Sequence, residues 1–192
     1  MDGMLFNKHL TTAEIEEALP RVLGVPKDNG RLEMIVIRPN VNEREIINSG
    51  VLHNEQGLIG DNWLTRSSSR TNNGLGHPEM QLNLMNYRYA ELIAGRRDRV
   101  PLAGDQLFVD LDLSSKNLLP GMRLSISGAV IEVTAIPHLG CKKFVERFGL
   151  DAMKFANSEF GRKQNLRGIN AKVITGSRIK TNDRVCRIVQ RD

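Results

Sequence analysis

Residues 122–136, MRLSISGAVIEVTAI, decide the fold class of this chain. Apolar and polar side chains alternate on both sides of Ser127-Gly128, and a two-residue connection of this kind is typical of a tight β-hairpin. The segment 107–113, LFVDLDL, has the same two-residue period. A half-buried strand produces this period because successive side chains point to opposite faces of a sheet. We therefore expect the second half of the chain to be rich in strands.

A few helices accompany the predicted strands. Thr11 and Glu14 have the spacing of a capping box, which marks the start of a helix. Because proline lacks an amide hydrogen and clashes with the preceding turn, we expect this helix to end near Leu19, before Pro20. A second helix is expected over residues 87–94, between an asparagine cap and a terminal glycine.

The pattern as a whole predicts a mainly β protein. Further strands are expected at residues 32–37, 80–85, 171–175 and 185–189. Many short strands with few helices favour a twisted β-barrel with short helices packed outside it. A chain of 192 residues is best read as one elaborated domain. We expect the helix and strand of residues 1–50 to pack as part of the same domain as residues 51–192.

Charge and composition narrow the function classes. The net charge is +5, and from His138 onward there are 13 Lys and Arg against 5 Asp and Glu, a field that attracts anions. Aromatic residues make up only 5% and form no basic-aromatic ladder, so nucleic acid is not an expected partner. Cys141 and Cys186 form no Cys-x-x-Cys pair, which fits a reducing, cytoplasmic setting. The sequence contains no stretch of about 18 apolar residues, so no membrane span is predicted.

The stretch PHLGCKKF around Cys141 carries the strongest chemical signal. Cys141 follows a glycine turn, opens a predicted helix over 141–148 and precedes Lys142-Lys143. Backbone N–H groups at a helix start and nearby ammonium groups favour the thiolate, the form that attacks electrophiles and binds soft metals. A small buried hydrophobe is the alternative reading of such a cysteine, and Cys186, in an apolar strand, fits that alternative better.

Several basic residues are candidates to hold an anion beside this cysteine. His138, three residues before it, is a candidate base or donor to an anion. Arg162 and Arg167 follow it, and arginine binds phosphate through two parallel hydrogen bonds. Arg66 and Arg70, in a long polar loop, are expected to approach from the other side. Each of these side chains also has the ordinary interpretation of a solvated surface charge.

Other catalytic patterns are absent or weak. The sequence has no phosphate loop, no dinucleotide-binding glycine motif and no Gly-x-Ser-x-Gly. The sequence contains neither a His-Glu-x-x-His motif nor a paired Cys/His spacing, so a zinc site is not predicted. Asp110 and Asp112 share a strand face, but that spacing alone is a weak sign of a catalytic carboxylate pair.

Seven segments together resemble a known family, the MOSC domain, named for the C-terminal domain of eukaryotic molybdenum cofactor sulfurases. The resemblance is to the stand-alone bacterial type. It runs from about residue 50 to 189. The matching segments are 57–63, 102–107, 110–114, 130–134, 138–144, 147–149 and 166–171. No single segment is diagnostic, but their order and spacing are fairly specific.

The resemblance implies a barrel-like fold and identifies Cys141 with the family's key cysteine. It implies that this cysteine carries sulfur as a persulfide or ligates molybdenum when the pterin cofactor, molybdopterin, binds. Asp61 matches the family's Gly-Asp turn, and Arg167 its Arg-Gly turn near the pocket. Many relatives have proline where this chain has Gly140. The sequence does not include the aminotransferase-like domain of the sulfurases or the separate N-terminal β-barrel domain of the related N-hydroxyl reductases.

Three functions follow from these patterns as hypotheses. The first is a sulfur carrier or molybdenum cofactor-binding protein, with Cys141 as carrier or ligand and Arg162, Arg167 and Lys142 holding an anionic group. Its partner would be a sulfur donor such as a cysteine desulfurase. The second is a molybdenum cofactor-dependent reductase of N-hydroxylated compounds, with an electron donor protein as partner. The third is a non-catalytic anion-binding module.

Overall fold

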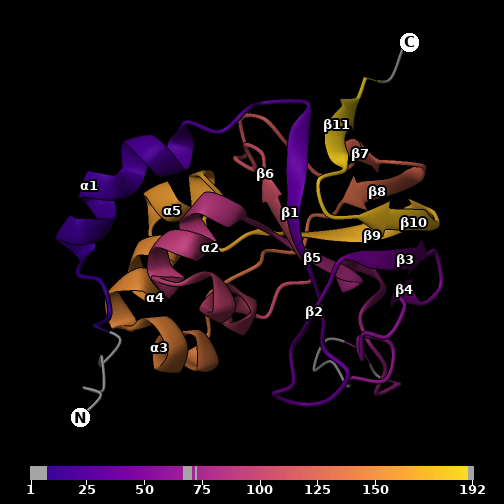
Figure 1. The fold of residues 1–192 in the computed structure, drawn as a ribbon, viewed down its shortest axis with the longest axis horizontal. Helices are drawn as coiled ribbons and strands as arrows, with labels where there is room; N and C mark the ends of the chain where they lie inside the picture. The colour runs from indigo at the N-terminus through magenta and orange to yellow at the C-terminus, as the bar shows by residue number, and fades with distance from the viewer. Residues whose placement is uncertain (1–7, 67–70, 72, 190–192) are drawn as a thin grey trace.

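The computed structural model describes residues 8–66, 71 and 73–189. Its centre is a mixed β-barrel of seven strands (Figure 1). Neighbouring strands follow the order β11-β7-β8-β9-β5-β6-β1, and β1 pairs with β11 to close the ring. β5 and β6 are parallel, and the other pairs in the ring are antiparallel. The strands are β1 (Gly30–Ile37), β5 (Leu82–Asn86), β6 (Leu107–Asp110), β7 (Arg123–Ile126), β8 (Ala129–Val133), β9 (Ile169–Thr175) and β11 (Arg184–Ile188).

The remaining elements lie around this barrel. β2 (Glu45–Ile47) pairs with the end of β1, and a small sheet is formed by β10 (Ser177–Lys180), β3 (Ser49–His53) and β4 (Gly57–Leu58). The helices gather on one side of the barrel (Figure 1). They are α1 (Thr12–Leu23), α2 (Tyr87–Ala94), α3 (Lys142–Phe148), α4 (Leu150–Asn157) and α5 (Glu159–Lys163), with 3₁₀ turns η1 (Pro78–Met80) and η2 (Arg97–Ala103).

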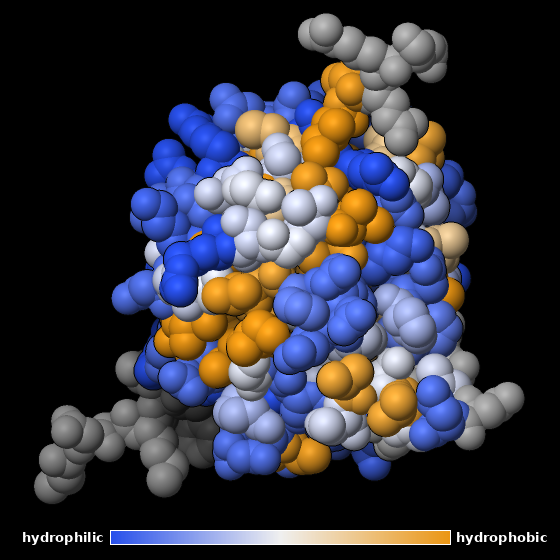
Figure 2. All heavy atoms as spheres, turned by 90° about the vertical axis from the view of Figure 1, so that its right-hand side faces the viewer, coloured by the Kyte–Doolittle hydropathy of each residue, from blue (hydrophilic) through white to orange (hydrophobic). Residues whose placement is uncertain are grey.

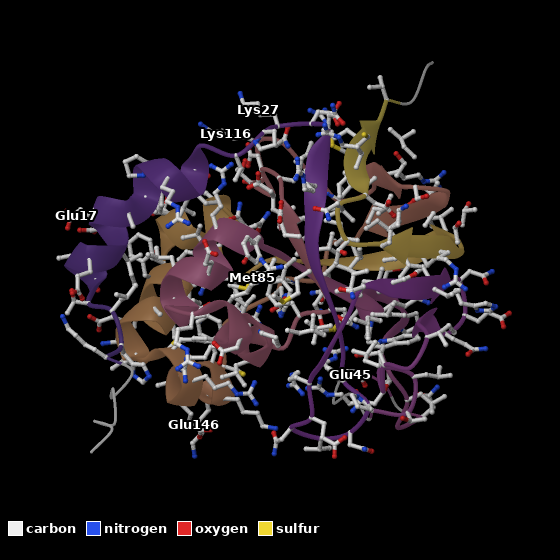
Figure 3. The ribbon with its side chains drawn as sticks, in the orientation of Figure 1. Glu17, Lys27, Glu45, Met85, Lys116 and Glu146 are labelled. Atoms are coloured by element: carbon white, nitrogen blue, oxygen red, sulfur yellow. The ribbon has the colours of Figure 1, made fainter. Side chains whose placement is uncertain are left out.

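Two apolar cores follow from the alternation of side chains along the strands. In β6, Leu107 and Val109 belong to the core inside the barrel, whereas Phe108 belongs to the core between barrel and helices. Met85 of β5 also lies in the second core, and Figure 3 places it at the centre of the molecule, far from the peripheral Glu146. The two-residue period of a strand therefore supplies both layers at once.

The predicted barrel with outer helices is confirmed, although strand and helix contribute almost equally, about 29% and 28%. The hairpin of residues 122–136 forms β7 and β8, with Ser127 at a positive φ of 54°. The capping box of Thr11 is also present. The predicted helix end was wrong, because α1 continues through Pro20 to Leu23 and buries Val22 against the other helices. Tertiary packing here outweighs the local effect of proline.

The outer surface is mixed in polarity. Figure 2 shows hydrophobic patches between hydrophilic areas on the side of the barrel, including a hydrophobic strip next to the C-terminal end. Ile188, the last residue of β11, is 37% exposed. Within the described residues, no helix has the length and apolar character needed to cross a membrane.

Candidate functional site

A cavity of about 540 Å³ opens where the loops after β1 and β4 face the start of α3. Its volume lies within the range usual for small-molecule sites. Six Lys and Arg residues line it, and no carboxylate is among its described lining residues. The six are Arg38, Arg44, Arg66, Lys143, Arg147 and Arg167. The cavity is therefore strongly favourable to anions.

Cys141 lies at this cavity and is exposed to solvent. It occupies the cap position directly before α3, and its side chain makes no capping hydrogen bond. Cys186, the other free cysteine, is half-buried in β11, and its Sγ lies 3.6 Å from Asn29 Oδ1. The thiol with access to the cavity is thus the one at position 141.

Arg38 is held in place by Asp61, a predicted site residue. The Asp61 carboxylate is fully buried and accepts from Arg38 Nε at 2.8 Å and from Nη2 at 2.7 Å. The Arg38 guanidinium also donates to Asn83 Oδ1 and to the carbonyl of Gly104. Such a bidentate pair fixes the plane of the guanidinium. Asp61 therefore does not line the cavity but orients a residue that does.

A second buried carboxylate orients Arg167 and lies beside His138. Asp105 accepts two hydrogen bonds from Arg167 Nη1, at 2.7 and 3.0 Å, and lies 3.4 Å from His138 Nδ1. Arg167 also stacks on Phe144 of α3, with its Cζ 5.0 Å from the ring centroid. Burial, followed by Arg167, Arg38 and other cations, holds the pKa of His138 well below its usual 6.5, so the imidazole is neutral.

The other four cations of the cavity, Arg44, Arg66, Lys143 and Arg147, have no carboxylate within ion-pair distance among the described residues. Desolvation, and then repulsion from Arg147 and Arg38, lowers the pKa of Arg44 to about 10. Desolvation and Arg38 also lower the pKa of Arg66, while Asp61 and then Cys141 act in the opposite direction. Cations that repel one another and have no carboxylate in direct contact are the electrostatic signature of an anion site.

The loop before the cysteine is fixed by α4. Gly140 N donates to Asn157 Oδ1 at 2.9 Å, and Asn157 Nδ2 donates back to the Gly140 carbonyl at 3.1 Å. A Cβ at position 140 would lie 3.0 Å from Met153 Cγ. The glycine at this position thus lets the loop lie close against the last turn of α4.

The structure brings some of the predicted site residues together and separates others. Cys141, His138, Arg66 and Arg167 all line the cavity. Arg162 is exposed on α5, and neither it nor the exposed Lys142 is among the lining residues. Lys143 takes the place expected for Lys142, because successive helical residues point in directions about 100° apart. Arg70 lies outside the described residues.

Sequence reasoning missed Arg38, Arg44, Arg147, Asp105 and Asn157. Arg38 had one available signal: it follows directly after the buried strand β1, where polar side chains often mark a site. Asp105 directly follows Gly104, a sequence typical of a surface turn, yet it is fully buried. Arg44 and Asn157 carry no local pattern, because their role comes from contacts between distant elements.

The donor set favours an anion, and any metal would need to arrive with ligands of its own. No group of three or more His, Cys, Asp or Glu within the described residues is arranged to hold a metal ion. Three buried side-chain nitrogens of the cavity residues have no hydrogen-bond partner: Arg44 Nε, Arg167 Nε and His138 Nδ1. Unpaired buried polar groups are rare in native proteins, and a bound anion would satisfy the two arginine donors.

Comparisons with known proteins concern the fold. No family model matches the sequence, and no curated protein matches it. The structure is similar to that of YuaD from Bacillus subtilis, with 16% identity, a TM-score of 0.58, and coverage of 84% of this chain and 97% of YuaD. It is also similar to YiiM from Escherichia coli, with 18% identity, a TM-score of 0.53, and coverage of 84% and 71%. For YiiM from Geobacillus stearothermophilus the identity is 12% and the TM-score 0.53, and the match covers 83% of this chain and 75% of that protein.

Proposed function

We propose that this protein is a MOSC-type sulfur carrier in which Cys141 accepts sulfur and the arginine cavity binds an anionic acceptor, molybdenum cofactor being the best candidate. One observation carries the proposal: a solvent-accessible thiol lies at a cavity whose described lining has six Lys and Arg residues and no carboxylate. An unpaired cluster of cations also attracts a thiolate and a negatively charged partner.

The fold supports this choice of function. YuaD and YiiM, whose fold is similar to that of this chain, are MOSC-domain proteins. The segments that resemble the MOSC family include the three residues His138, Cys141 and Arg167, which meet at the cavity. Fold and sequence pattern therefore support the same family by separate routes.

The proposed step is an exchange between a persulfide and a thiolate. The Cys141 thiolate attacks the outer sulfur of a donor persulfide, such as that of a cysteine desulfurase. A new S–S bond forms at Cys141 Sγ, the donor S–S bond breaks, and the donor leaves as a thiolate. No outside oxidant is needed, because the sulfane sulfur keeps its oxidation state. Arg66 lines the same cavity as Cys141 and would be the nearby cation for the anionic groups in this exchange.

The residues of the cavity fit a phosphorylated pterin cofactor. Arg44 and Arg167 have unpartnered Nε donors for a phosphate, and Cys141 is the soft ligand that molybdenum prefers. When bound, the cofactor would supply a redox-active metal centre. The protein's own part is to bind the phosphate, to present the thiol and to keep His138 neutral.

The test is sulfur loading of Cys141. The purified protein is incubated with a cysteine desulfurase and cysteine, and peptide mass spectrometry then locates any added sulfur atom. We expect one sulfur on Cys141 in the parent and in Cys186→Ser, and none in Cys141→Ala. Absence of added sulfur at Cys141 would refute the carrier function.

The cation cavity is tested separately with inorganic pyrophosphate as the probe. Binding to the folded protein should raise the Tm of the parent. Arg147→Met should reduce this rise, whereas the matched variant Arg162→Met should not, because Arg162 is exposed outside the cavity. A non-catalytic anion-binding module is the conclusion if pyrophosphate binds but Cys141 never gains sulfur.

A reductase of N-hydroxylated compounds is the second candidate. The observation in its favour is the cavity volume of about 540 Å³, which has room for more than a single sulfur atom. Protein produced in a cofactor-proficient host should then contain molybdenum, and an electron donor protein should support turnover. Metal analysis of that preparation separates the reductase from a bare carrier.

A further inference from the structure

The carboxamide of Asn157 is the principal polar contact of the backbone that leads into Cys141. It satisfies both the N–H and the carbonyl of Gly140, at 2.9 and 3.1 Å. Its Nδ2 also lies 3.2 Å from Met153 Sδ, within the same helix α4. The residue directly before the cysteine is therefore held through both of its backbone polar groups by one side chain.

Steric contact acts at the same point. A Cβ added to Gly140 would lie 3.0 Å from Met153 Cγ and 3.5 Å from both terminal atoms of Asn157. The loop thus lies close against α4, and a larger residue at position 140 would require Met153 or the loop to move by a few tenths of an ångström. Close contact and two hydrogen bonds together restrict the backbone more than either does alone.

Cys141 itself has little to hold its side chain. It is exposed and makes no side-chain capping hydrogen bond to α3. The position of its Sγ relative to the cavity cations therefore depends on the backbone in front of it. That backbone is the segment fixed by Asn157.

We propose that Asn157 is a positioning residue, which holds Gly140 so that Cys141 Sγ faces the unpaired cations of the arginine cavity. This inference rests on the proposed function, because it explains how the carrier thiol is aimed at its anionic reaction partners. Asn157 acts through the Gly140 backbone and does not line the cavity.

The test compares two alkylating reagents of almost equal size, iodoacetate and iodoacetamide, in a Cys186→Ser background. With either reagent an S–C bond forms at Cys141, the C–I bond breaks and iodide leaves. Only iodoacetate carries a negative charge. The ratio of its rate constant to that of iodoacetamide therefore reports how closely Sγ faces the cations, and changes in exposure or thiolate fraction cancel out.

In the parent we expect this ratio to exceed that of glutathione, and Asn157→Ala to lower it about threefold or more at low salt. Asn117→Ala is the matched control. Asn117 is also a buried carboxamide that binds two backbone carbonyls, those of Lys27 and Asp112, but it lies outside the cavity. The variant Asn117→Ala should lower the Tm but leave the ratio of the two alkylation rate constants unchanged.

A second variant approaches the same contact from the loop. Gly140→Ala should also lower the ratio, because the added Cβ pushes the loop away from Met153 and Asn157. If both changes act through one contact, the double variant should show little more than either single effect. Gly140→Ala also decides the question if Asn157→Ala does not fold.

Three results would overturn the proposal: an unchanged ratio in folded Asn157→Ala, an unchanged ratio in Gly140→Ala, or an equal fall in Asn117→Ala. The outcome is independent of sulfur loading. If the ratio falls as expected but Cys141 never gains sulfur, the positioning role stands and the carrier function fails. If Cys141 gains sulfur normally but the ratio is unchanged in Asn157→Ala, the carrier function stands and the positioning role fails.

Discussion

Asp61→Asn should destabilise the fold strongly, although the side chain barely changes in size. The Asp61 carboxylate accepts from the backbone N, Nε and Nη2 of Arg38, from Trp63 N and from Gln106 Nε2. All of these groups are donors. Asparagine has a single acceptor oxygen, so in either orientation its NH₂ group faces donors.

The magnitude follows from burial. The side chains of Arg38 and Asp61 are only 4% and 0% exposed. Breaking a buried ion pair by removing one charge costs about 3–5 kcal/mol, because the remaining charge is left without compensation. For a protein of this size 1 kcal/mol corresponds to about 2–4 °C in Tm, so the expected fall is roughly 6–20 °C.

Thermal and urea unfolding of Asp61→Asn and of a control, Asp98→Asn, measure this effect. Asp98 pairs with Arg96 at the surface, where the two side chains are 63% and 64% exposed, and such exposed pairs contribute little to stability. A loss in Asp61→Asn no larger than that in Asp98→Asn would refute the reasoning. Asp61→Leu combined with Arg38→Met should recover part of the loss, because no buried charge then remains unpaired.

Three further predictions concern pH, charge and backbone. His138 stays neutral in the folded protein and titrates near 6.5 when unfolded, so the unfolded state binds more protons at acidic pH. The free energy of unfolding should therefore fall below pH 6.5, by up to about 1.4 kcal/mol per pH unit, and His138→Gln should flatten this slope in urea titrations. Arg44→Met should raise the free energy of unfolding slightly at low salt, by less than about 1 kcal/mol, because it removes repulsion from Arg147 and Arg38; a gain that persists in high salt would contradict this cause. Gly168→Ala should cost about 3 kcal/mol or more in urea unfolding, since φ is +105° and the new Cβ would lie 2.2 Å from the carbonyl oxygen of Leu84; a stable variant would show that this turn can relax.

The parts of the fold that sequence could predict are those fixed by local chemistry. The alternation around Ser127 gives the hairpin of β7 and β8, and Thr11 with Glu14 gives the start of α1. Both signals lie within a few residues of the structure they determine. The end of α1 was missed because the burial of Val22 depends on helices far along the chain.

The same distinction applies to the site. Cys141 could be singled out because its glycine, helix start and lysines are neighbours in sequence. The position of Arg38 after a buried strand is only a general signal. Its contacts could not be predicted, because its partners Asp61 and Gly104 come close to it only when the barrel forms. Whether Lys142 or Lys143 faces the cavity depends on the rotation of α3, which Phe144 fixes by packing against Arg167.

The closure of the barrel has a consequence for how the chain folds. β1 meets β11 through Gly30 with Val185 and Arg31 with Arg184, so strands from opposite ends of the sequence must find each other. Pairings of such long range slow folding, since the intervening chain has to be ordered first. Until β11 arrives, β1 and β7 each leave an edge open to intermolecular strand pairing. Substitutions that weaken the pairing of β11 with β1 or with β7 are therefore expected to increase aggregation and chaperone dependence during overexpression.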